Sequence, residues 1–153
     1  MTRKEYVDAF IRAFEGIFSG ITGKEATVKS IEETEEAIPS YEVAALVGII
    51  GFIRGQMSLS TDLKAARDLV KVVLPGREGT KDVEKSAVGE LANMVAGRVT
   101  IELAGEDKKL YLTPPAVVLG SNLKVAVPGV KVSVVKFDTY LGEFEITVGL
   151  IES

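Results

Sequence analysis

The last third of the chain contains five segments with strand propensity and no helix between them. Proline, glycine and asparagine separate these segments. Neighbouring parallel strands need a long crossover, usually a helix, whereas antiparallel strands can be joined by tight turns. The pattern therefore argues against a doubly wound parallel fold and predicts a largely antiparallel sheet. The five segments are residues 109–113, 116–119, 123–127, 130–138 and 144–151.

The first forty residues predict a helix followed by a short strand. Apolar residues recur at helical spacing over residues 4–19, with Thr2 available as the N-cap and Gly20 as the stop. Residues 26–31 are predicted as the strand. The acidic remainder up to Ser40 is expected to be a solvated loop, because four of its residues are glutamates.

The next segment predicts a hairpin and a second helix. Residues 41–49 and 52–60 are rich in strand-forming residues and close enough to pair through a tight turn. We expect Ser60 or Thr61 to cap a helix that extends to Val73. A third helix is predicted to begin after Gly79 and Thr80, with acidic residues in its first turn, and to end at Gly105.

This order of elements describes an α+β domain with an antiparallel-rich mixed sheet and helices packed on one face. The chain has 153 residues, of which 46% are hydrophobic. That length is typical of one domain and allows a substantial core without cross-links. We therefore predict a single domain over residues 1–153.

The chain has no cysteine, histidine or tryptophan. Their absence excludes disulfides, thiol and imidazole nucleophiles, and zinc sites built on cysteine or histidine. Any chemistry must therefore come from carboxylates, amides, hydroxyls or amines.

The charge and hydropathy argue against nucleic acid and membrane partners. The formal net charge is −4 and the sequence pI is near 5.0, whereas both partners favour a basic surface. The most apolar run, residues 43–53, is far shorter than the roughly 20 residues of a membrane-spanning helix. Charged residues interrupt the amino-terminal segment, so we expect no signal peptide and a cytoplasmic protein.

The third predicted helix presents a polar stripe. Each residue turns a helix by roughly 100°, so Ser86, Glu90, Asn93 and Gly97 fall within a sector about 60° wide. The apolar residues of this helix centre on the opposite side. They are Val88, Leu91, Ala92, Val95 and Val99. One side of the helix is therefore predicted to pack, while the other presents a carboxylate and an amide to solvent.

The segment from Ser86 to Pro115 resembles the CheC/CheX/FliY family of bacterial chemotaxis phosphatases. That family is marked by a Ser or Asp four residues before a Glu, an Asn three residues after it, and a downstream proline. Ser86, Glu90 and Asn93 match this pattern, and Pro114 and Pro115 match the proline position to within a residue or two. The resemblance implies a CheC-like fold.

Within that family the chain is most like CheX. The CheC type has a second Glu and Asn pair in its first helix, whereas here Phe18 stands where the asparagine is needed. The resemblance then implies a homodimer with one site per subunit. It also implies a protein substrate, the aspartyl-phosphate form of a CheY-type response regulator.

The resemblance also implies a role for each residue of the stripe. Asn93 is expected to enter the partner's site and orient the attacking water, and Glu90 to meet a cationic side chain of the partner. The partner is expected to supply a divalent metal and a lysine, so the chain needs no cofactor of its own. Ser86, Gly89 and Gly97 are candidate partner-binding residues. The alternatives are that Ser86 caps local polar groups and that the two glycines allow tight helix packing.

Two other functions remain open at this level. The same helix face could belong to a noncatalytic adaptor that binds a response regulator or a flagellar-switch component. The fold could also belong to a small-ligand sensor, which would need an enclosed apolar pocket where the phosphatase hypothesis predicts an open, shallow face.

Overall fold

The computed structural model describes residues 2–36, 38–39, 41–77, 79–120, 124–125 and 130–152. Three helices and nine strands follow one another along these residues. The helices are α1 (Arg3–Thr22), α2 (Leu63–Val73) and α3 (Lys81–Ala104). The strands are β1 (Thr27–Thr34), β2 (Ile38–Pro39), β3 (Val43–Gly51), β4 (Ile53–Thr61), β5 (Leu110–Leu112), β6 (Ala116–Leu119), β7 (Lys124–Val125), β8 (Val132–Thr139) and β9 (Gly142–Glu152).

The main sheet confirms the predicted α+β class. Its strands lie in the order β1-β8-β9-β4-β3-β5, and β6 pairs with β3 beside β5. Every pairing between described strands is antiparallel, so the sheet is more uniform than the mixed sheet expected from the sequence. The predicted hairpin is the β3–β4 pair, in which Ile49 faces Gly55.

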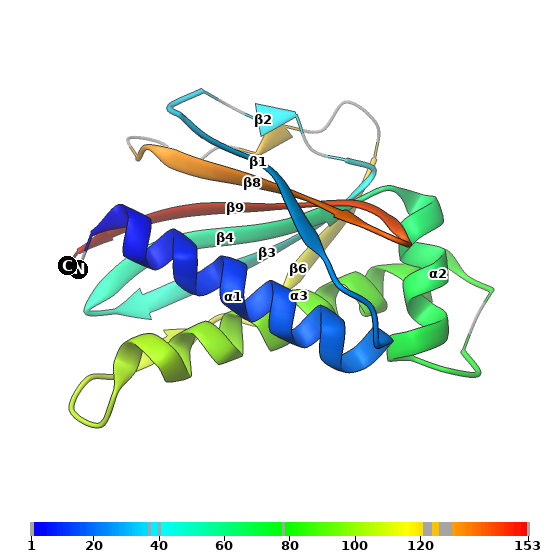
Figure 1. Ribbon diagram of the computed structural model, residues 1–153, viewed down its shortest axis with the longest axis horizontal. Coiled ribbons are helices and arrows are strands. Elements are labelled where there is room, and N and C mark those ends of the chain that lie inside the picture. The colour runs from blue at the N-terminus through cyan, green and yellow to red at the C-terminus, as the bar shows by residue number, and fades with distance from the viewer. Residues whose placement is uncertain are drawn as a thin grey trace.

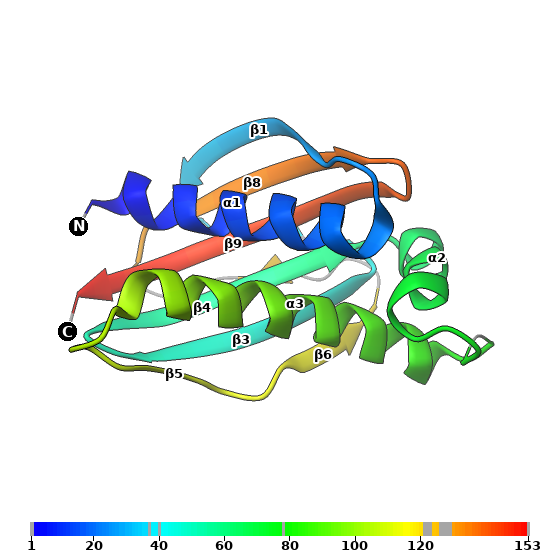
Figure 2. The ribbon, with the colours of Figure 1, turned by 60° about the horizontal axis from the view of Figure 1, so that its bottom comes forward.

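The molecule is layered. Helices α1 and α3 lie across one face of the main sheet, and α2 lies at one end (Figure 2). Strands β2 and β7 pair as a small second sheet on the opposite side from the helices (Figure 1). Of the predicted strand over residues 123–127, the structure describes only Lys124 and Val125, and the other three residues lie outside the described part.

Aromatic side chains of α1 form the centre of the core. Phe10, Phe14 and Phe18 are fully buried. The ring of Phe14 lies with its centroid 4.3 Å from that of Phe137 on β8 and 5.7 Å from that of Phe144 on β9. Phe18, which marks the departure from the two-centre pattern, is therefore a core residue.

The predicted stop of the first helix at Gly20 is wrong. The helix begins with the expected cap, in which the Thr2 hydroxyl accepts a hydrogen bond from the Glu5 amide at 3.2 Å. It continues through Gly20 to Thr22, and Gly23 ends it in the left-handed conformation at a φ of 72°. The added turn lets Ile21 pack against the core.

The predicted cap of the second helix is also wrong. Ser60 and Thr61 belong to β4, where they pair with Glu145 and Phe144 of β9. Asp62 occupies the N-cap position instead. The cause is the sheet, because pairing with β9 holds both residues in the extended conformation. The predicted end at Val73 is confirmed.

Strand β1 is longer than predicted. Residues 32–34, expected in the acidic loop, pair with β8 as its continuation. Glu32 and Glu33 remain exposed on this edge strand, so their charges cost little desolvation. Glu35 and Glu36 lie beyond the strand, as the loop prediction had them. The loop prediction is also wrong for Ile38 and Pro39, which form β2 and pair with β7. Ala37 and Ser40 lie outside the described residues.

Candidate functional site

Helix α3 begins and ends where the sequence predicted. The Thr80 hydroxyl accepts a hydrogen bond from the Val83 amide at 3.2 Å, and Gly105 follows the last helical residue. Asp82 and Glu84 lie in the first turn, where the helix dipole favours negative charge. The helix runs along the face of the sheet between α1 and β5 (Figure 2).

One side of α3 is fixed by burial. Its five predicted apolar residues have exposed fractions of 1% or less. They are Val88, Leu91, Ala92, Val95 and Val99. Burying a valine or leucine side chain contributes about 1.5–3 kcal/mol, so any rotation of the helix about its axis would be costly. The opposite side must therefore point outward.

An ion pair between a buried carboxylate and an exposed guanidinium also fixes the start of α3. Glu84 is only 6% exposed, and Nε of Arg67 on α2 lies 3.2 Å from its Oε1. Glu84 was predicted to lie at the positive end of the helix dipole, but its contact with Arg67 was not predicted. It depends on how α2 packs against α3, which no local pattern indicates.

The predicted stripe faces solvent. Ser86, Glu90 and Asn93 are exposed, and Gly97 is partly exposed. We call these four residues the α3 stripe. The predicted division of the helix into a packed side and a polar side is therefore confirmed.

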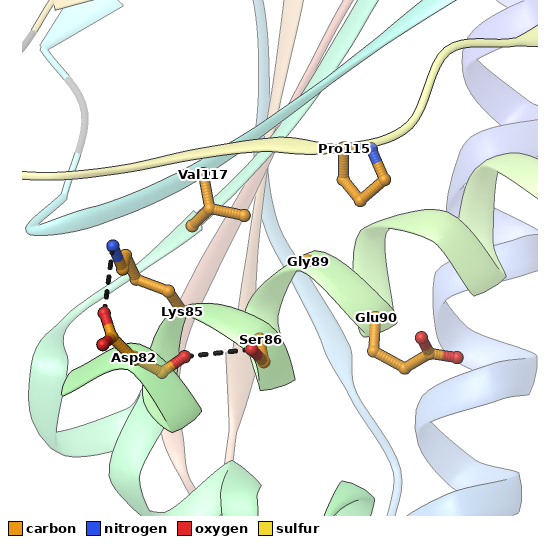
Figure 3. A pocket seen from close by; sticks show the side chains of 7 residues that line it. All are labelled: Asp82, Lys85, Ser86, Gly89, Glu90, Pro115 and Val117. Carbon is orange, nitrogen blue, oxygen red and sulfur yellow. Dashed lines mark hydrogen bonds and ion pairs between the residues drawn. The ribbon is translucent and has the colours of Figure 1, made fainter. Parts of the chain in front are cut away.

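The polar residues at the start of the stripe contact one another. The Ser86 hydroxyl donates a hydrogen bond to the carbonyl oxygen of Asp82 at 3.0 Å, and Lys85 Nζ lies 3.3 Å from an Asp82 carboxylate oxygen (Figure 3). The Ser86 bond is the local capping alternative considered from the sequence. Partner binding by Ser86 stays a prediction.

The two glycines of interest differ in their surroundings. Gly89 is buried, and a Cβ there would lie 3.0 Å from Val117 Cγ2 and 3.6 Å from Pro115 Cγ. It therefore allows β6 to approach α3 closely, which is the packing alternative. At Gly97 a Cβ would meet nothing within 4 Å. The two partner-binding assignments stay predictions, but only Gly97 leaves open space on the stripe.

A shallow hollow lies between α3 and β6, beside Glu90 (Figure 3). It is open to solvent, unlike the enclosed apolar pocket that a small-ligand sensor would need. Pro115 was matched from the sequence to the family's downstream proline, but Val117 and Lys85 were not predicted to lie at the site. The hollow is lined by Asp82, Lys85, Ser86, Gly89, Glu90, Pro115 and Val117.

The exposed groups limit the chemistry of this surface. Asn93 offers an amide that can both donate and accept hydrogen bonds, and Glu90 offers an acceptor. Within the described ranges, no three carboxylate, imidazole or thiol side chains lie close enough together to hold a metal ion. No helix in the described part of the chain is both long enough and apolar enough to cross a membrane. The arrangement suits orientation of a reactant that another molecule carries.

Comparison with known proteins gives a family. The family model for the chemotaxis phosphatase CheX matches residues 43–138, which include all of α3 and Pro115. A curated relative, the CheY-P phosphatase CheX of Thermotoga maritima, is 36% identical over 111 residues. The alignment covers 71% of this chain and 68% of the relative.

Solved structures share the fold. A chemotaxis protein CheX from Desulfovibrio desulfuricans has a TM-score of 0.84 at 23% identity, covering 97% of this chain and 99% of that one. The CheX in a CheX–CheY–BeF3–Mg2+ complex from Borrelia burgdorferi has a TM-score of 0.74 at 21% identity, covering 96% and 98%. At these identities the likeness establishes the architecture.

Proposed function

This chain belongs to the CheX family of chemotaxis phosphatases, and we propose on that basis that its α3 stripe acts on the aspartyl phosphate of a CheY-type response regulator. The chain is a response-regulator phosphatase. The observation that carries the proposal for the site is the exposure of Glu90 and Asn93 on a helix whose other side is buried.

Asn93 is the proposed catalytic residue. An acyl phosphate is already a reactive bond, so the missing contribution is a water held in line with the phosphorus. The amide oxygen of Asn93 accepts a hydrogen bond from this water, and its NH2 group can donate one to a neighbouring oxygen. Attack forms a bond from the water oxygen to phosphorus and breaks the bond to the aspartyl oxygen. The products are the regulator's carboxylate and inorganic phosphate.

Glu90 is the proposed docking residue. It lies about one helical turn before Asn93 on the same stripe, and no ion pair is recorded for it within the described residues. A carboxylate in this state is available to a cationic side chain of the regulator, and a charge-assisted hydrogen bond would fix the register of the two proteins. Ser86 and Gly97 would border this contact.

The divalent metal is proposed to come with the regulator. This chain has no histidine or cysteine, and the acidic side chains at its site are those of Asp82 and Glu90. Asp82 is already paired with Lys85. A cation held by the regulator would supply neutralisation of the phosphoryl oxygens, and this chain's own contribution is to dock and to orient water.

We also propose a homodimer that works in the cytoplasm. The outer strand β6 has exposed apolar residues, Ala116 and Val118, at an edge of the sheet, and such edges are commonly covered by another strand. Static light scattering would then give about twice the 16.4 kDa mass of one chain. The cytoplasm is proposed because phosphorylated response regulators are signalling proteins of that compartment.

The proposal is tested by phosphate release from a phosphorylated CheY-type regulator with catalytic amounts of this chain. We expect Asn93→Ala to lower kcat by about a hundredfold or more, because an oriented reactant is lost. Its thermal unfolding should stay unchanged, because the side chain is exposed. Gln56→Ala is the matched control, since it removes an amide from β4 on another face of the molecule.

Two results would count against this assignment. Wild-type turnover by Asn93→Ala would remove the proposed mechanism. Binding of the regulator without any turnover by the wild-type chain would instead indicate the noncatalytic adaptor.

A further inference from the structure

Ile101 on α3 is an apolar side chain that lies largely in solvent. It is 80% exposed, the largest exposed fraction recorded for a large hydrophobic residue in the described part of the chain. It follows Asn93 and Gly97 at four-residue spacing, so it extends the α3 stripe toward the end of the helix. At 1.5 Å per residue, it lies about 12 Å along the helix from Asn93.

The surface around Ile101 is hollowed on both sides. Toward α1, Ile101 lines a hollow with Arg12, Gly16 and Arg98, and toward β5 it lines another with Lys108 and Lys109. The Arg98 guanidinium lies across Gly16, within 2.7 Å of where a Cβ would be. Ile101 therefore stands between two depressions, and the open surface at Gly97 separates it from Asn93.

The charge of the helix face changes along its length. The hollow beside Glu90 is lined by two carboxylates and one amine, from Asp82, Glu90 and Lys85. The lining residues of the two hollows beside Ile101 include four cations and one carboxylate, that of Glu102. This carboxylate is already paired with Arg12. A partner that binds this face of α3 should therefore place a cation against Glu90 and an acidic surface against the cationic hollows beside Ile101.

We propose that Ile101 is a docking contact for the receiver domain of the response regulator. The inference rests on the proposed function, which places the phosphorylated aspartate at Asn93. A domain of about 100 residues has a radius of gyration near 13 Å, so a regulator seated on Asn93 is large enough to cover Ile101 as well. The contacting surface on the regulator is an apolar depression bordered by carboxylates, about 12 Å from the phosphorylation site.

Because its side chain is apolar, Ile101 should contribute to binding of the regulator and not to the chemical step. Its side chain cannot exchange a proton or orient a water, so it acts through binding of the protein substrate. Loss of such a contact weakens the substrate complex and the transition state equally, which raises KM and leaves kcat unchanged.

The test compares Ile101→Ser with Ile31→Ser, a control at a 54% exposed isoleucine on β1. The probe is the CheY-type regulator that the wild-type chain dephosphorylates, activated with Mg2+ and beryllofluoride for equilibrium binding. We expect Ile101→Ser to weaken Kd at least about tenfold and to raise KM similarly, since an isoleucine is worth that much when buried. Ile101→Leu should restore both values, and Ile31→Ser should change neither.

Three results would overturn the inference. The first is an unchanged Kd and KM in Ile101→Ser, and the second is a fall in kcat alone. The third is a drop in mass by light scattering, which would assign Ile101 to contact with a second copy of this chain. If Asn93→Ala has lost turnover in the same assay, any of these results leaves the proposed function standing. A wild-type chain that neither binds nor dephosphorylates a regulator overturns both.

Discussion

The backbone that carries Asn93 is held by buried neighbours along α3. Leu91 and Ala92 precede Asn93, Val95 and Ala96 follow it, and all four are fully buried. The backbone on both sides of Asn93 is therefore anchored in the core, which leaves only the rotamers of the amide itself to be fixed on docking. This anchoring reduces the ordering entropy that a partner must overcome.

The buried carboxyl group of Glu145 makes the stability of the folded chain depend on pH. Glu145 is 2% exposed on β9, between Ser60 of β4 and Lys136 of β8. Burial raises the pKa of its carboxyl from 4.5 to about 7; Lys136 opposes this shift, whereas Glu143 and Glu32 add to it. The folded protein therefore holds this proton more tightly than the unfolded chain does.

We predict that Glu145→Gln removes a loss of stability between about pH 4.5 and pH 7. Below this window both states of the wild type are protonated. Within it the unfolded chain releases the proton first, so the free energy of unfolding falls as pH rises, by about 2–3 kcal/mol in total. Urea unfolding of both proteins from pH 4.5 to 8 measures the difference, which should grow in favour of the variant. A difference that stays constant over this range would refute the assignment.

At the scale of the helix, alanine substitutions at two glycines should have the same effect on stability but different effects on binding of the regulator. Gly97→Ala fills open space in a helix interior and should raise the free energy of unfolding by about 0.5–1 kcal/mol. Gly20→Ala on α1 has equally open surroundings and should do the same. Only Gly97→Ala places a methyl group between Asn93 and Ile101, so it alone should raise KM for the regulator several-fold. Denaturant unfolding and steady-state turnover test both effects, and an equal KM in the two variants would contradict the role of Gly97.

The elements were predictable where local chemistry decides them. Thr80 and Gly105 bound α3 through a side-chain cap and a glycine, and both signals lie in the local sequence. Gly20 was the predicted stop of α1, but the helix continues to Gly23, and the added turn packs Ile21 against the core, which no local signal indicates. The extra length of β1 likewise depends on β8, which lies about a hundred residues further along the chain.

In the candidate site, too, the features set by local sequence were predictable and those set by long-range contacts were not. The α3 stripe follows from the helical period, which needs no tertiary information. The close approach of Pro115 and Val117 to α3 at Gly89 does not follow from that period, because it requires β6 to pair with β3 and so to lie beside α3. The helical period also places Ile101 in line with the α3 stripe, but only the structure shows that its side chain is 80% exposed.

At the scale of the molecule, the proposed site faces away from the small β2–β7 sheet. Helices α1 and α3 form one outer layer and that sheet lies on the opposite side (Figure 1). Glu145 and its partner Ser60 belong to the face of the main sheet that does not contact the helices, because their strand neighbours Phe144, Ile146 and Leu59 form the helix-side core. A pH-dependent change at Glu145 should therefore alter stability without reaching Asn93.

The whole chain should also work without a metal of its own. It has no histidine or cysteine, and its described carboxylates do not converge in a metal-binding group. We predict that chain treated with EDTA and then desalted shows full turnover when Mg2+ is supplied with the regulator, because the cation must contact the phosphoryl group there. Titration of Mg2+ into the chain alone should give no binding heat. Activity that returns only after this chain is preincubated with Mg2+ would place a metal on it and require a different mechanism.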